Sequence, residues 1–320
     1  MTIIPYKGVP IFNSDGTFRK EDDIVQGRSF SSNLTKMLKH MNKLEDIQRG
    51  KPPSPVMAHI SLTNACNLIY IVYFCCFANR DISEKMPTET VLKALDSFKA
   101  IGITGVEFTG GGEPSIHPDF KQIVRYAKDL GFSLGICTNA ARFGMDRPIK
   151  KDIVELFDWV RMGMYGFYEG YDYDLRVFEG TNCKPSAAYV WDENLATSNN
   201  PNITGDWTDV KNKRIKSKKF QTTDNFVRML DWVEENKIPC RIAFNAIKDV
   251  KETAKDIETI RDIIAEYEND RGRKLQSAFL SDFNFKGERR NDHCYMHMVK
   301  PFLFTDGYIY ACPSAELSIE

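Results

Sequence analysis

The 320-residue sequence predicts an α/β protein in which strands of a parallel sheet alternate with helices. Two observations support this class. Short apolar segments that read as strands are followed by amphipathic helical segments, and Gly or Pro residues separate these units. About six such units fit either a partial barrel or a doubly wound sheet. In barrels of this type the chemistry lies on the loops that follow the carboxyl ends of the strands.

The expected elements follow one another in a regular order along most of the chain. Six segments read as strands: 57–62, 105–109, 133–138, 159–164, 240–246 and 275–280. Six read as helices: 32–48, 87–100, 117–130, 149–157, 225–236 and 253–269. The order breaks over residues 165–223, which are rich in Tyr, Asn, Asp and Lys. Residues 294–312 read as a hairpin around Asp306 and Gly307.

Composition limits the function classes. A formal net charge of −1 gives no overall field that favours nucleic acid or an anionic membrane. No stretch of eighteen apolar residues is present, and the first residues lack the layout of a secretion signal. We therefore expect a soluble, cytoplasmic protein with no membrane or nucleic-acid partner, and we interpret the basic segment 211–219 as a solvated loop.

A glycine-rich segment follows the second expected strand. Gly110, Gly111 and Gly112 precede Glu113 and Pro114, and we call residues 110–113 the glycine loop. Glycines at a strand end allow positive φ and close approach of the backbone to a ligand. Glu113 offers a carboxylate that can accept from an ammonium group. A tight turn with a solvated Glu113 is the structural alternative.

Three of the eight cysteines lie close together after the first expected strand. Cys66, Cys75 and Cys76 belong to the segment 66–77, which we call the cysteine loop. In a reducing compartment clustered cysteines favour a metal or catalytic site over disulfides. Buried or incidental thiols are the alternative.

The glycine loop and the start of the cysteine loop resemble motifs of the radical S-adenosylmethionine (SAM) superfamily. The resemblance extends over residues 57–280 and implies a partial (β/α)6 TIM-type barrel. It also implies that Gly111, Gly112 and Glu113 bind SAM, as in the family's GGE motif. Residues 137–140 (CTNA) resemble the family's TNG segment, which makes Thr138 and Asn139 neighbours of SAM.

The cysteine loop departs from the family's CxxxCxxC pattern. Counting from Cys66 places the second and third ligands on Tyr70 and Tyr73, and counting back from Cys76 places the second on residue 72 or 73. Tyrosine is a poor ligand here because its oxygen is hard and its pKa is near 10. Either Cys66, Cys75 and Cys76 form an unusual three-thiol site for a [4Fe–4S] cluster, or the cluster is compromised.

The resemblance implies an enzyme that reductively cleaves SAM at the cluster and forms a 5′-deoxyadenosyl radical, which abstracts hydrogen from a substrate. A reductant protein such as flavodoxin or ferredoxin and a small-molecule or peptide substrate are the implied partners. One alternative is a cluster-deficient barrel that acts as a SAM-binding or regulatory protein. Another is an ordinary barrel enzyme whose glycine loop binds phosphate through backbone N–H groups. The sequence singles out no catalytic acid or base.

We expect three parts: an N-terminal extension (1–55), a core barrel (56–285) and a C-terminal hairpin (286–320). Cys294 and Cys312 in the hairpin resemble the start of a SPASM or twitch extension, which binds auxiliary clusters in peptide-modifying members of the superfamily. Two cysteines cannot complete a four-thiolate cluster, so a hairpin with two free thiols is an equal alternative. In the fourth expected strand Arg161 agrees with the family pattern, whereas Gly163 stands where the family has Ser.

Overall fold

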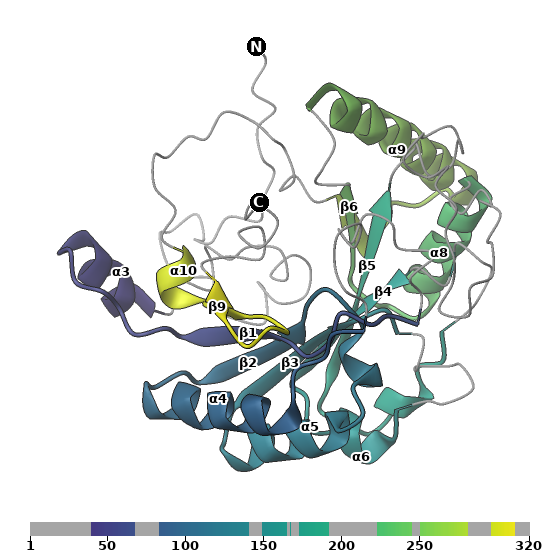
Figure 1. The fold of residues 1–320 in the computed structure, drawn as a ribbon. Coiled ribbons are helices and arrows are strands. Elements are labelled where there is room, and N and C mark those ends of the chain that lie inside the picture. The colour runs from purple at the N-terminus through teal and green to yellow at the C-terminus, as the bar shows by residue number, and fades with distance from the viewer. Residues whose placement is uncertain are drawn as a thin grey trace.

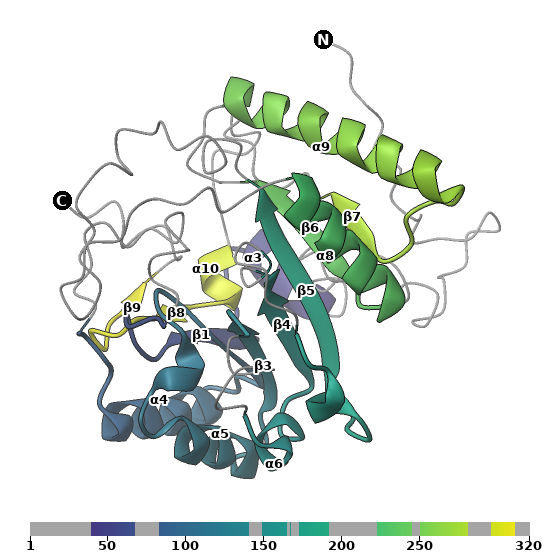
Figure 2. The same cartoon turned by 90° about the vertical axis from the view of Figure 1, so that its right-hand side faces the viewer.

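The computed structural model describes residues 40–67, 83–140, 149–164, 167, 173–191, 223–244, 250–280 and 296–310. Its strands form one sheet in the order β7-β6-β5-β4-β3-β2-β1-β8-β9. All neighbouring pairs from β7 to β8 are parallel, and β9 is antiparallel to β8. The structure confirms the α/β class and the parallel sheet. Because the order from β1 to β7 follows the chain, each new strand extends the same edge of a curved sheet (Figures 1 and 2).

The strand bounds are close to those that the sequence predicts. The seven strands of the barrel are β1 Met57–Ser61, β2 Gly105–Thr109, β3 Ser133–Thr138, β4 Trp159–Gly163, β5 Lys184–Trp191, β6 Cys240–Phe244 and β7 Ala278–Leu280. Strands β8 Phe302–Leu303 and β9 Ile309–Tyr310 turn at Asp306 and Gly307, as expected, and β8 extends the sheet beside β1.

The helices cover the outer face of the sheet. Helices α4 Thr88–Ala100, α5 Phe120–Asp129 and α6 Lys151–Val154 lie beneath β1 to β3, whereas α8 Thr223–Glu235 and α9 Val250–Arg271 lie outside β5 and β6 (Figure 1). The remaining helical segments are α3 Met41–Gln48, α10 Met296–Val299 and two 3₁₀ turns at Pro114–Ile116 and Arg176–Phe178. Apolar side chains such as Phe108, Phe120 and Phe157 fill the space between sheet and helices.

Strand β5 is the element that sequence reasoning missed, because it falls within the segment 165–223 that breaks the regular order. Its first half contains Pro185 and small residues, which have low β propensity. Pro185 is tolerated because Lys184, Pro185 and Ser186 pair with β4 alone, and pairing with β6 begins at Ala187. With β5 in place, residues 240–244 form the sixth strand rather than the fifth.

Among the described residues, no helix combines the length and apolar character needed to cross a membrane. The helix expected at 32–48 is described only from residue 41 onward as α3.

Candidate active site

The glycine loop lies against the chain that leads into the cysteine loop. Three successive backbone N–H groups, those of Gly111, Gly112 and Glu113, donate to Ser61 Oγ (3.3 Å), the Thr63 carbonyl (2.9 Å) and the Ala65 carbonyl (2.8 Å). Gly110 has a φ of 132°, which favours glycine. A Cβ on Gly112 would collide with the carbonyl oxygens of residues 63 and 65. The close approach that the glycines allow is therefore first of all to the protein's own backbone.

These contacts bear on what ligand the glycine loop can bind. A phosphate-binding loop needs several backbone N–H groups pointing at the anion. Here the N–H groups of residues 111–113 are used within the protein, so they are not available for phosphate. What the loop can still offer is acceptors, and an ammonium group needs acceptors.

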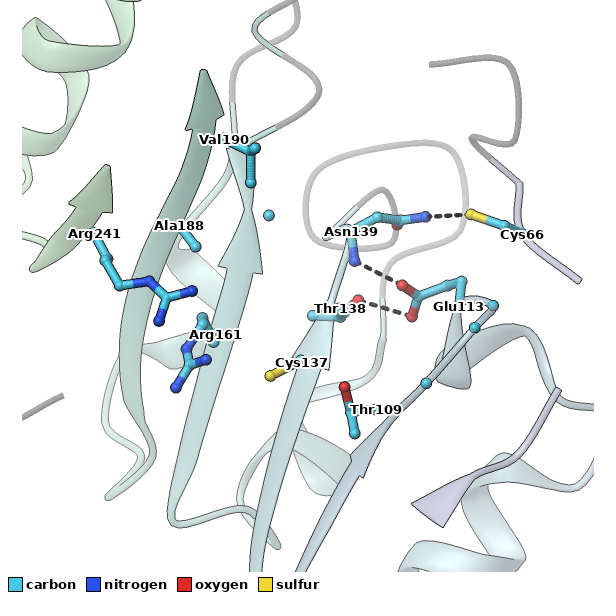
Figure 3. Close-up of a pocket in the computed structure, with 14 residues that line it drawn as sticks. Cys66, Thr109, Glu113, Cys137, Thr138, Asn139, Arg161, Ala188, Val190 and Arg241 are labelled. Carbon is cyan, nitrogen blue, oxygen red and sulfur yellow. Dashed lines mark hydrogen bonds between the residues drawn. The ribbon is translucent and has the colours of Figure 1, made fainter. Parts of the chain in front are cut away.

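Glu113 joins the end of β2 to the end of β3. Its carboxylate accepts from the N–H of Ser115 (3.0 Å), the hydroxyl of Thr138 (2.8 Å) and the N–H of Asn139 (2.6 Å). The side chain is buried, and this burial raises the pKa of the Glu113 carboxyl, although the three hydrogen bonds oppose the shift. Two of the predicted SAM-binding residues, Thr138 and Asn139, are thus held in place by a third (Figure 3).

Cys66 lies at the same place, beside Asn139. The amide Nδ2 of Asn139 donates to Cys66 Sγ (3.4 Å) and to Asn67 Oδ1 (2.8 Å). Cys66 is partly exposed, and Figure 3 shows its sulfur on the side of Asn139 and Glu113. Hydrogen bonds to sulfur are one of the means by which proteins tune an iron–sulfur cluster.

The two flanks of the cysteine loop are held together. The backbone N–H of Asn64 donates to the Glu84 carbonyl (2.9 Å), and the N–H of Met86 donates to the Leu62 carbonyl (2.9 Å). The Glu84 carboxylate accepts from Asn64 Nδ2 (2.7 Å) and from the hydroxyl of Thr305 beyond β8 (2.8 Å). The residues just before and just after the undescribed segment 68–82 are therefore neighbours in space.

Several sequence predictions fall on residues that the structure does not describe. They are the ligands Cys75 and Cys76, the tyrosines at 70 and 73, and the tail residues Cys294 and Cys312. Within the described ranges, no group of three His, Cys, Asp or Glu side chains could hold a metal ion. The cluster ligands therefore stay a prediction beyond Cys66.

One cavity of about 220 Å³ contains the described site residues. All six described residues predicted to bind the cofactors line it: Cys66, Gly111, Gly112, Glu113, Thr138 and Asn139. Side chains of the later strands complete the wall, namely Arg161, Ala188, Val190 and Arg241. The cavity is smaller than a typical ligand pocket of ~300–1,000 Å³. It adjoins Cys66 and Asn139, which lie within two residues of the undescribed segments 68–82 and 141–148.

Below this cavity, polar groups on the inner face of the sheet form a cluster that sequence reasoning missed. His59 on β1 and Glu107 on β2 are neighbours in the sheet, with His59 Nε2 2.7 Å from Glu107 Oε2. Lys300 Nζ lies 3.7 Å from the same oxygen, and Cys137 Sγ donates to the other (3.3 Å). The sequence signal that could have revealed this cluster is a titratable residue in the middle of an apolar strand, His59 in β1 and Glu107 in β2.

The electrostatics of this cluster follow from burial and neighbours. Burial alone would raise the pKa of Glu107, but His59, Lys300 and Arg161 together outweigh it and hold that pKa well below its usual range. Burial lowers the pKa of His59, against the influence of Glu107. Burial also raises the pKa of the Cys137, Cys183 and Cys240 thiols to about 12, so these three stay protonated at neutral pH.

Comparison with known proteins finds one family model that matches part of the chain. Residues 60–170, which contain Cys66, the glycine loop and Asn139, match the model of the "Radical SAM superfamily". This segment is thus similar to the radical SAM superfamily, over about a third of the chain. The matched range covers β2, β3 and β4 and ends before β5, so Arg241 and the later strands lie outside it.

Relatives agree with this assignment. The chain is 31% identical over 102 residues to an S-adenosylmethionine-dependent nucleotide dehydratase of Selenomonas ruminantium, a match that covers 31% of this chain and 35% of the relative. It is 36% identical over 101 residues to a tungsten-containing aldehyde ferredoxin oxidoreductase cofactor-modifying protein of Pyrococcus furiosus, covering 31% of this chain and 27% of the relative. The matched segment thus spans about a third of these relatives.

The fold is shared with a solved structure. The crystal structure of Streptococcus suis SuiB bound to the precursor peptide SuiA covers 90% of this chain and 66% of SuiB, with a TM-score of 0.50 and 16% identity. At this identity the likeness concerns the fold alone, and it agrees with the α/β architecture described above.

The superfamily uses a [4Fe–4S] cluster and SAM, and the described residues include one thiol and a set of acceptors of the kinds that these groups need. The partly exposed thiol of Cys66 supplies the soft ligand that iron prefers, and it lines the cavity. The glycine loop and Glu113 supply acceptors next to Cys66 in the same cavity, of the kind that an ammonium group needs.

Proposed function

We propose that this protein is a radical SAM enzyme whose cofactors bind at the carboxyl ends of β1, β2 and β3. The observation that carries the proposal is the shared cavity. Cys66, the glycine loop and Asn139 come from three different strand ends and line one space, within the segment that matches the family model. Chemistry at this edge of the sheet is what a barrel of this type favours.

We assign each residue one part of the work. Cys66, with Cys75 and Cys76 from the cysteine loop, provides the thiolates for the cluster. Gly111, Gly112 and Glu113 hold the amino end of SAM, and Thr138 and Asn139 fix the position of Glu113 by hydrogen bonds of 2.8 and 2.6 Å. When bound, the cluster supplies the electron that cleaves a C–S bond of SAM and yields the radical that abstracts hydrogen from substrate.

Two alternatives to a radical SAM enzyme remain to be compared, and the geometry of the glycine loop bears on the first. A phosphate-binding barrel is disfavoured because three N–H groups of the glycine loop are engaged by residues 61–65. A SAM-binding protein without a cluster is the second candidate, since the altered cysteine spacing motivates it. Such a protein has the same glycine-loop contacts as the proposed radical SAM enzyme. The two differ only in whether the protein binds iron.

We extend the proposal to the substrate, the partners and the cellular location of the whole protein, which lie beyond what the matched segment covers. We propose a small-molecule or peptide substrate, a flavodoxin or ferredoxin as reductant, and a cytoplasmic location. The name of the Selenomonas relative refers to a nucleotide, and the SuiB structure contains a precursor peptide. We also propose the division into an extension (1–55), a core (56–285) and a C-terminal part (286–320), in which β8 extends the core sheet.

Anaerobic reconstitution with iron and sulfide tests the proposal. We expect about four irons per chain, an absorption band near 400 nm, and release of 5′-deoxyadenosine when SAM and a strong reductant are added. SAM binding without iron would instead identify the cluster-deficient protein. Phosphate binding that SAM does not displace, and that persists when Arg161 and Arg241 are both replaced by Gln, would revive the phosphate-binding alternative.

A further inference from the structure

Two arginines on the inner face have no part in the glycine loop or the cysteine loop, although Arg161 agrees with the family pattern of its strand. Arg161 occupies the middle of β4, and Arg241 lies near the start of β6. Both line the cavity that contains the glycine loop, whereas His59 and Glu107 are not among its lining residues. The family model ends at residue 170, so nothing in the motif assigns a role to Arg241.

Sheet register brings the two arginines to one region. Arg161 is the sheet partner of Ser186 on β5, and Arg241 is the partner of Ala188, two residues further along the same strand. Because residues two apart on a strand share a face, both side chains project from the same side of the sheet. Figure 3 shows both guanidinium groups on the side of β4 and β5 that faces Cys137 and Glu113.

Small side chains leave space around these guanidinium groups. Gly163 and Ala188 are sheet partners, and both line the cavity beside the arginines. Both arginine residues are partly exposed rather than buried. Arg161 also lies over the ring of Trp159, 5.5 Å from its centroid, which restrains its side chain on that side.

The chemistry of the two cavity walls is opposite in sign. The glycine loop and Glu113 offer acceptors on the β2 side, and Arg161 and Arg241 offer donors on the β4 and β6 side. A guanidinium group has five N–H donors in a planar fork, so an arginine that already has one contact can still bind a carboxylate or phosphate. Charge-assisted hydrogen bonds of this kind are stronger than those between neutral groups.

We propose that Arg161 and Arg241 bind an anionic group, a carboxylate or phosphate, carried by the substrate across the cavity from SAM. The proposal rests on the proposed function, because it places the substrate beside the cofactor. The arginine pair would then select substrates that carry a negative group. Strands β4 and β6 would take part in substrate recognition. The carboxylate of SAM is the other source of the same chemistry.

Binding of simple anions to the protein without cluster or reductant tests the arginine pair directly. Inorganic phosphate and malonate serve as probes, and their affinity is measured by calorimetry for the wild type, Arg161→Gln and Arg241→Gln. We expect each substitution to weaken binding at least tenfold. The matched control is Arg125→Gln, a half-exposed surface arginine paired with Asp152, which leaves the affinity unchanged.

Lysine variants and SAM binding complete the design. Arg241→Lys keeps the charge and loses the fork, so we expect an intermediate loss of about three- to tenfold, which an unfolded variant would not give. Unchanged SAM affinity in the glutamine variants assigns the anion to the substrate, whereas a parallel loss of SAM affinity assigns it to the SAM carboxylate and overturns the substrate assignment.

No anion binding in the wild type, or equal binding in all variants, overturns the arginine site itself. Either result leaves the proposed function standing, because iron content and 5′-deoxyadenosine release are measured separately. Conversely, anion binding in a protein that forms no cluster would refute the proposed function and keep the site.

Discussion

The rim of the cavity and the inner face of the sheet are built on different principles. The rim consists of the glycine loop with Thr138 and Asn139, and backbone groups make most of its contacts. The inner face consists of His59, Glu107, Cys137, Arg161 and Arg241, and its contacts are between side chains of different strands. The rim depends on the shape of short segments, whereas the inner face depends on charge and on sheet register.

This difference explains what can be predicted from the sequence. The glycine loop occupies four adjacent positions, so its requirement for residues without a side chain is visible in the chain itself. The five inner-face residues lie on five different strands, with tens of residues between them in the sequence. They become neighbours through pairing, which a single sequence does not display. Local patterns therefore identify the rim, and topology is needed to find the inner face.

The largest expected effect at the rim is that of Gly112→Ala. Its Cβ would overlap the carbonyl oxygens of residues 63 and 65, so the entry to the cysteine loop has to move. We expect a loss of about 3 kcal/mol in the free energy of unfolding, measured by urea denaturation. The matched control is Gly105→Ala at the start of β2, where the nearest atom is Met57 Cβ at 3.6 Å. Equal losses in both variants would contradict the account of the glycine loop.

On the inner face, Glu107→Gln tests charge rather than shape. The lowered pKa of Glu107 means that its carboxylate stabilises the fold above the unfolded-state pKa of about 4.3, and that this contribution is lost as the pH falls. We expect the variant to be less stable than the wild type by about 2 kcal/mol at pH ~7, with the difference shrinking below pH ~4.5. A difference that is constant with pH would show that the charge of Glu107 has no role.

Glu113→Gln removes the charge of a rim residue and keeps its shape. An amide NH₂ would replace one acceptor and face the N–H or hydroxyl donors of residues 115, 138 and 139. We expect a loss of about 1.5 kcal/mol in stability together with weaker SAM binding. Glu258→Gln on the exposed side of α9 is the control, with a change within about 0.5 kcal/mol. Unaltered stability would mean that Glu113 does not join β2 to β3.

The smallest effect is expected at Ala140, which stands where the family's TNG segment has glycine. Its φ of 56° is in the left-handed region, which is unfavourable for alanine. Ala140→Gly should therefore raise the stability by about 0.5 kcal/mol. Ala94→Gly in the middle of α4 should lower it by about 1 kcal/mol. A loss at both positions would show that the strain at Ala140 is compensated.

The elements themselves were predicted with uneven success, for physical reasons. Strands β2 and β3 begin and end at the predicted residues, because Gly and Thr or Asn delimit compact apolar runs there. Strand β5 was missed because Pro185 and the small residues after it lack β propensity, and its neighbours β4 and β6 stabilise it instead. Arg241 was missed as a site residue for the same reason, since its partner Ala188 lies on that strand.

The central claim is that Cys66 holds iron beside the glycine loop. The direct test compares iron per chain after anaerobic reconstitution in the wild type, Cys66→Ser and Cys183→Ser. Cys183 is a buried thiol next to β5 that does not line the cavity, so it controls for the loss of any cysteine. We predict that Cys66→Ser loses the cluster and that Cys183→Ser keeps it. Wild-type iron content in Cys66→Ser would contradict the account.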